Sequence, residues 1–135
     1  MAGETDLGKL LASMKPVLQP EEYVFCSTST LTYKDLEALN PMGCYQEGEG
    51  MSLILQRAVA DTAGFKYDAV FRAITLSVHS SLEAVGFTAA IAGKLAEHNI
   101  SANIVAAHYH DHLFVPAEKV NEALQLLQQF EGSDC

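Results

Sequence analysis

The chain has 135 residues, the length of one domain or of two very small ones that share a core. Hydrophobic residues make up 49% of it and the mean hydropathy is +0.10, so a real core can form. The net charge is −9, from 8 basic and 17 acidic residues, with no basic run. This charge argues against nucleic acid and anionic membrane surfaces as partners, because both are bound through clustered Lys and Arg.

The first half of the chain predicts short helices alternating with strands. Leu7, Leu10, Leu11 and Met14 lie on one face of a helix capped by Thr5 or Asp6, and Pro16 and Pro20 end that segment. The elements expected next are strand 22–27, helix 33–39, strand 42–47, a turn at 48–50, strand 51–56 and helix 57–62 closed by Gly64. Residues 66–69 are expected to form a linker.

The second half predicts the same order of elements. The expected elements are strand 71–79, a helix from the Ser80–Glu83 capping signature to about His98, strand 101–108, strand 113–115 and a helix from Pro116 to Phe130. Asn99 is expected to stop the first of these helices in a left-handed conformation.

The compartment is expected to be the reducing cytoplasm. Cys26, Cys44 and Cys135 show no metal-ligand or redox spacing, and their odd number does not predict a disulfide framework. The N-terminus lacks the basic start and apolar run of a signal peptide. No apolar stretch approaches the about 18 residues of a membrane span.

The repeated β-α-β-β-α order indicates an internal duplication. Leu53-Ile54-Leu55 and Leu113-Phe114-Val115 occupy corresponding places in the two halves, each before a step from strand to helix. The expected fold class is α+β and ferredoxin-like, with antiparallel sheets and helices on one face, in an N-terminal half 1–66 and a C-terminal half 67–135. Each half is one strand short of the six-element unit, so the other half or another copy is expected to cover a sheet edge.

The second half resembles an ACT domain. Arg72–Phe87 reads as a strand and a loop with a glycine, Gly86, just before the helix, and Asn103 lies on the matching second strand. The first half, with Asn40-Pro41-Met42 and Glu47–Met51, and the run His110–Pro116 are similar to a little-characterised family of tandem ACT-like bacterial proteins. This resemblance implies a regulatory role, because related tandem ACT regions control aspartokinases by binding amino acids at a half-to-half or dimer interface. The loop before Gly86 lacks the proline of the usual Asp-x-Pro-Gly run and is longer.

The loop before this helix is the expected ligand site. A helix N-terminus offers free N–H groups to a carboxylate, and Glu83 could pair with an α-ammonium group. The alternative is a plain capping box formed by Ser80 and Glu83 that binds nothing. The expected ligand-binding residues are His79, Ser80, Ser81, Glu83, Val85, Gly86, Phe87, Asn103 and Ile104.

A histidine cluster offers a different function. His108, His110 and His112 would share one face of a strand, and with Asp111 they are residue types that bind zinc. The run sits at an expected hairpin turn, which would break the alternation, so a polar hairpin tip is the competing interpretation.

No nucleophile–base pair, P-loop or dinucleotide fingerprint is present in the sequence, so neither catalysis nor a cofactor is expected. Three functions stay open. The first is a non-catalytic module that binds an amino acid, and the second is a metal-binding protein or hydrolase that uses the histidine cluster. The third is a protein that only oligomerises. A homodimer is expected for the first and third.

Overall fold

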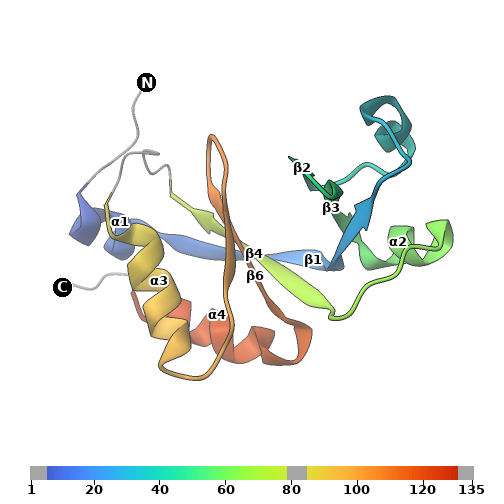
Figure 1. The fold of residues 1–135 in the computed structure, drawn as a ribbon. Helices are drawn as coiled ribbons and strands as arrows, with labels where there is room; N and C mark the ends of the chain where they lie inside the picture. The colour runs from blue at the N-terminus through green and yellow to red at the C-terminus, as the bar shows by residue number, and fades with distance from the viewer. Residues whose placement is uncertain (1–5, 79–84, 131–135) are drawn as a thin grey trace. The chain divides into compact units, whose positions relative to one another are not determined.

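The structure of the chain, a computed structural model, describes residues 6–78 and 85–130. Its elements are α1 (Leu7–Ser13), β1 (Lys15–Thr28), η1 (Tyr33–Ala38), β2 (Gly43–Glu47), β3 (Gly50–Gln56), α2 (Arg57–Ala63), β4 (Phe71–Ser77), α3 (Phe87–Ala96), β5 (Asn103–Ala106), β6 (Asp111–Pro116), η2 (Ala117–Lys119) and α4 (Val120–Gln128) (Figure 1). They confirm the α+β class and the repeated order: β1-η1-β2-β3-α2 is followed by β4-α3-β5-β6-α4.

The described chain forms two compact units. One, the inserted unit, is Pro20–Phe71, and the other, the split unit, combines the residues up to Gln19 with those from Arg72 onward. Strand β1 therefore supplies residues to both units. The division into 1–66 and 67–135 stays a prediction about the sequence repeat, because the packing of the first 19 residues follows the C-terminal half.

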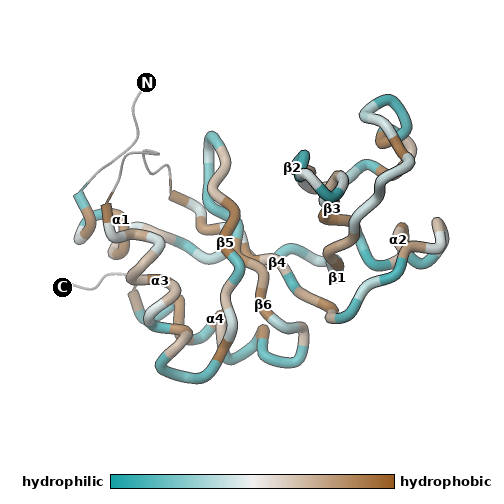
Figure 2. Tube along the Cα trace, in the orientation of Figure 1, coloured by the Kyte–Doolittle hydropathy of each residue, from teal (hydrophilic) through white to brown (hydrophobic). Residues whose placement is uncertain are grey.

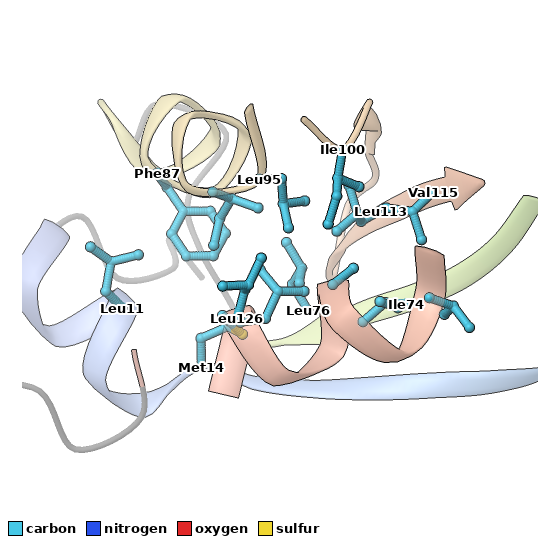
Figure 3. Close-up of a cluster of buried hydrophobic side chains, with 14 of the residues drawn as sticks. Leu11, Met14, Ile74, Leu76, Phe87, Leu95, Ile100, Leu113, Val115 and Leu126 are labelled. Atoms are coloured by element: carbon cyan, nitrogen blue, oxygen red, sulfur yellow. The ribbon is translucent and has the colours of Figure 1, made fainter. Parts of the chain in front are cut away.

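The split unit packs three helices on one face of its strands, which lie in the order β1-β4-β6-β5. Figure 3 shows Phe87 and Leu95 pointing from α3 towards Leu126 of α4 and Leu76 of β4, with Leu11 and Met14 entering from the side of α1. Figure 2 shows hydrophilic residues in the turn between β5 and β6 and apolar residues along β6. Phe87, Ile91 and Leu95 are buried and form the apolar stripe of α3.

The inserted unit has its own smaller core beneath the strands β2-β3-β1. Alternate residues of β3 are buried, and Leu53 and Leu55 pair with Cys26 and Val24 of β1 in the antiparallel register. Gly64 closes α2 in the left-handed conformation that was predicted, with φ of 80°. A sheet face and short helices thus enclose a core without residues from the rest of the chain.

Strand β1 is longer than the sequence predicted. The expected strand covered 22–27, and Pro16 and Pro20 were expected to end the helical segment before it. The helix does end before them, at Ser13, but β1 runs from Lys15 to Thr28 through both prolines. Proline removes one N–H donor and fixes φ, and an extended strand tolerates both where no ladder bond is needed. The first part of β1 adds the fourth strand that the split unit was expected to lack.

Helix α3 starts later than predicted. It was expected to begin at a Ser80–Glu83 capping box, but its first residue is Phe87 and its N-cap is Gly86, while Ser80 and Glu83 lie outside the described residues. The helix ends close to the predicted His98, and Asn99 takes the expected left-handed conformation with φ of 59°. Strand 101–108 is also shorter than expected, since β5 ends at Ala106.

A line of hydrogen bonds ties three strands of the split unit together. Gln19 Nε2 donates to Thr75 Oγ1 at 2.8 Å, and Thr75 Oγ1 lies 3.0 Å from His112 Nδ1. Thr75 alternates with the core residues Ile74 and Leu76, so this line lies on the face of the sheet away from the helices. Burial lowers the pKa of His112, and the nearby His110 lowers it further, while Asp111 raises it. The neutral imidazole fits this geometry because its Nδ1 can accept the Thr75 proton.

We predict that Leu10→Ala in α1 destabilises the protein by about 2–5 kcal/mol, because Leu10 is fully buried in the split unit's core. Leu7→Ala is the matched control on the same helix; Leu7 is 36% exposed, so its loss should cost roughly 0.5 kcal/mol or less. Urea unfolding measures both. Equal, small effects would mean that α1 does not pack with the C-terminal half.

We also predict that stability decreases as the pH falls below about 6.5, partly because of His112. The pKa of His112 is lowered in the folded chain, so the unfolded chain takes up the proton at a higher pH and acid favours unfolding. His112→Asn keeps a polar group beside Thr75 but cannot titrate, so its free energy of unfolding should drop less between about pH 7.5 and about pH 5.5.

Urea unfolding at both pH values tests this, with His108→Asn as the matched control because His108 is an exposed turn residue. If His112→Asn and the wild type lose the same free energy of unfolding, His112 is not responsible.

Candidate functional site

The predicted ligand loop leads into α3. Of the residues predicted there, His79, Ser80, Ser81 and Glu83 lie outside the described residues. Val85, which directly precedes the N-cap Gly86, is 83% exposed. The described part of the predicted site is therefore the exposed start of this helix.

Gly86 has the conformation that this helix start requires. Its φ of 91° lies in the left-handed region, where a side chain would strain the backbone, and a Cβ would also lie 3.3 Å from Leu7 Cδ2. The first turn closes when the N–H of Ala90 donates to Gly86 O at 2.9 Å.

The amides that precede Ala90 have no acceptor within the helix, and glycine has no side chain to cap them. They carry the partial positive charge of the helix dipole, so this end of α3 suits a carboxylate.

The other predicted ligand residues have structural partners. Phe87 is 3% exposed and its ring belongs to the core of the split unit. Ile104 packs against the same core from β5. Asn103 is exposed on β5, opposite Phe114, and its Nδ2 donates to Phe114 O at 3.5 Å. The structure thus places Val85 and Gly86 together, whereas Asn103 and Ile104 lie on a different element.

The histidine cluster does not form one face of a strand. His108 lies in the turn between β5 and β6, exposed, with its ring 4.8 Å from that of Tyr109 in an edge-to-face arrangement. His110 is also in the turn, and only Asp111 and His112 belong to β6. Within residues 6–78 and 85–130, no three His, Cys, Asp or Glu side chains gather as metal ligands. The turn breaks the alternation, as the competing interpretation predicted.

The inserted unit has a pocket of about 800 Å³ that was not predicted from the sequence. Its lining includes Phe25 and Ser27 of β1 and, from the segment that follows α2, Phe65, Lys66, Tyr67 and Asp68. Part of this segment was interpreted as a linker. The signal that could have revealed it is the alternation of two aromatic residues with two opposite charges directly after the helix-closing glycine.

The cysteines of the inserted unit are free. Cys26 is buried at the edge of this pocket, and burial raises the pKa of its thiol. A thiol with a raised pKa stays protonated at neutral pH, and a protonated thiol is a poor nucleophile. This environment does not activate Cys26 for covalent chemistry.

Comparison with known proteins identifies the family. The ACT domain family matches the chain twice, over residues 2–72 and over residues 69–129. The chain is 48% identical to a Vibrio cholerae protein of unknown function, described as a possible transport protein, over 94% of this chain and 96% of that one, with a TM-score of 0.85. No curated protein matches the sequence.

More distant solved structures share the fold. The ligand-free regulatory subunit of aspartate kinase from Thermus thermophilus superposes with a TM-score of 0.64 at 11% identity, over 87% of this chain and 97% of that one. A protein from Agrobacterium tumefaciens superposes with a TM-score of 0.70 at 14% identity, over 89% of this chain and 90% of that one.

Across the described parts of the chain, no helix has the length and apolar character needed to cross a membrane. The two family matches and the antiparallel strands with their helices confirm the predicted ferredoxin-like fold. The chain belongs to the ACT domain family and carries two ACT domains in tandem.

Proposed function

We propose that this protein is a non-catalytic regulatory module that binds a small molecule, and that its ligand is an amino acid held at the start of α3. The observation that carries the proposal is the N-terminus of α3. There Gly86 takes a left-handed conformation and leaves the first amides of a ten-residue helix uncapped by its own residue.

The chemistry of this helix start fits one end of an amino acid. The first amides and the helix dipole bind the carboxylate, and Gly86 starts the helix in a left-handed conformation without a side chain that could cap those amides. The exposed Val85 provides an apolar contact beside it. Ser80, Ser81 and Glu83, three to six residues before Gly86 in the sequence, would supply the polar groups for the α-ammonium.

Two further observations support a module without chemistry of its own. The chain belongs to a family of ACT domains, and its fold is similar to that of a regulatory subunit of aspartate kinase.

We predict that one or a few of the common amino acids raise the melting temperature of the full chain. A ligand at 100 times its Kd stabilises the folded state by about 2.7 kcal/mol, which thermal-shift measurements detect readily. Gly86→Ala should abolish the shift, because it strains the left-handed backbone that starts the helix by about 1–2 kcal/mol and brings a Cβ to 3.3 Å from Leu7 Cδ2, which should displace the first amides.

Gly93→Ala is the matched control for this variant. It makes the same chemical change within α3, at a position where an added Cβ meets nothing within 4 Å, so the protein should keep its ligand response. Calorimetric titration at a temperature where both variants are folded separates binding from stability. If no amino acid shifts the wild-type melting temperature, the proposal is wrong.

We further propose that the protein self-associates as a homodimer. Strand β5 ends the strand order in the split unit and β2 ends it in the inserted unit, so each has one backbone edge without a partner strand among residues 6–78 and 85–130. Tyr45 on β2 is 74% exposed and Val105 on β5 is 37% exposed, which gives both edges apolar side chains to bury.

Light scattering should give the mass of a dimer, about twice 14.6 kDa. Val105→Lys should shift the equilibrium towards monomer if β5 forms the interface, and Tyr45→Lys should do so if β2 does. A monomer at every concentration tested would rule out the homodimer.

A further inference from the structure

Two half-buried histidines flank Asp111 where the turn between β5 and β6 ends. His110 is the last turn residue and His112 belongs to β6, and the two are close enough for the charge of one to act on the other. The turn residues before them, His108 and Tyr109, are exposed, and Figure 2 shows the turn projecting from the split unit. Two side chains of the type that titrates near neutral pH are thus packed together beside an exposed turn.

His112 is held as a neutral imidazole by the line of hydrogen bonds across β1, β4 and β6. Gln19 Nε2 donates to Thr75 Oγ1 at 2.8 Å, so the Thr75 hydroxyl has its own proton available for His112 Nδ1, 3.0 Å away. A protonated His112 carries a hydrogen on Nδ1 as well. Thr75 would then accept two hydrogen bonds, and its own proton would lose its acceptor at a buried position.

His110 lacks one hydrogen bond while the hairpin is closed. Its Nδ1 is buried and has no hydrogen-bond partner among the described residues. Its backbone oxygen accepts from the N–H of Ala107 at 3.1 Å, and this bond closes the turn. Opening of the turn would expose Nδ1 to water, so the His110 side chain favours the open hairpin and the bond from Ala107 opposes it.

The charges that act on His112 come from its neighbours in the sequence. Burial is the largest cause that lowers the pKa of His112, the nearby His110 lowers it further, and Asp111 raises it. The groups that face His112 from the adjacent strands are neutral: Thr75 on β4, and Val105, its partner in the β5–β6 register. Within the described residues, one carboxylate therefore opposes the build-up of positive charge at this site.

We infer that the end of the β5–β6 hairpin, residues 105–112, is a pH-sensitive element that is closed at neutral pH and opens locally in mild acid. Opening lets water solvate both imidazoles, so the open form takes up protons more readily than the closed form does. The rest of β6 stays in place, because Leu113 and Val115 are buried in the core of the split unit. The inference concerns the hairpin alone and does not depend on ligand binding at the start of α3.

Amide hydrogen exchange of the full chain, at about pH 7.5 and about pH 5.5, tests the inference at the Ala107 amide. The pKa of His112 is lowered in the closed hairpin, so the open form takes up the proton first as the pH falls. With an ordinary histidine value of about 6.5 in the open form, the open population should rise by up to about tenfold. After correction for the intrinsic pH dependence of exchange, the protection of Ala107 should fall by this factor.

Two comparisons show whether the opening is local and whether the histidines cause it. Low concentrations of urea should leave exchange at Ala107 unchanged, whereas they should speed exchange at Leu76 of β4, whose amide needs global unfolding to exchange. His112→Asn should remove most of the pH effect at Ala107, and His110→Asn should reduce it. His108→Asn is the matched control in the exposed turn and should leave the effect unchanged.

Three results would overturn the inference. The first is equal protection of Ala107 at both pH values after the correction. The second is the same urea dependence at Ala107 and Leu76, because the opening would then be global. The third is a full pH effect in His112→Asn. Circular dichroism checks that each variant is folded, and a full pH effect in His110→Asn counts equally against the inference if His112→Asn does not fold.

Discussion

The structure depends on one strand that serves two cores. β1 is 14 residues long; its first part lies beside β4 in the split unit, and its second part pairs with β3 in the inserted unit. Leu18 packs against one core, whereas Val24 and Cys26 belong to the other. The chain begins in the split unit, forms the whole inserted unit and then returns to the split unit. Neither unit is therefore a simple half of the sequence. The unit that contains the C-terminus cannot form its full sheet without the N-terminal 19 residues.

Local signals in the sequence predicted most of the fold, and long-range packing accounts for what they missed. Gly64 and Asn99 were recognised because a left-handed helix end leaves a local signature, and β3 was predicted close to its observed bounds because the turn before it is local too. The early start of β1 was missed, because whether a strand tolerates prolines such as Pro16 and Pro20 depends on neighbours that are distant in the sequence. The start of α3 was predicted too early because Ser80 and Glu83 form a convincing capping pattern, while Gly86 is the N-cap.

The candidate sites, too, could be predicted only where the signal is local in the sequence. The resemblance to ACT domains singled out Gly86, and in the structure its backbone takes the left-handed conformation that glycine favours. The alternation after Gly64 marks one wall of the pocket beside Lys66, but the other wall comes from β1, and Phe25 and Phe65 are 40 residues apart in the sequence.

Backbone amide shifts test most directly the proposal that the start of α3 binds the carboxylate of an amino acid. In a ¹H–¹⁵N correlation spectrum titrated with the amino acid that binds best, the amides of Gly86, Phe87 and Thr88 should shift with saturation. Gly93, in the middle of the same helix, should move little. Saturable binding that leaves the amides of residues 85–89 unmoved, or the absence of any shift with all common amino acids, would contradict the account.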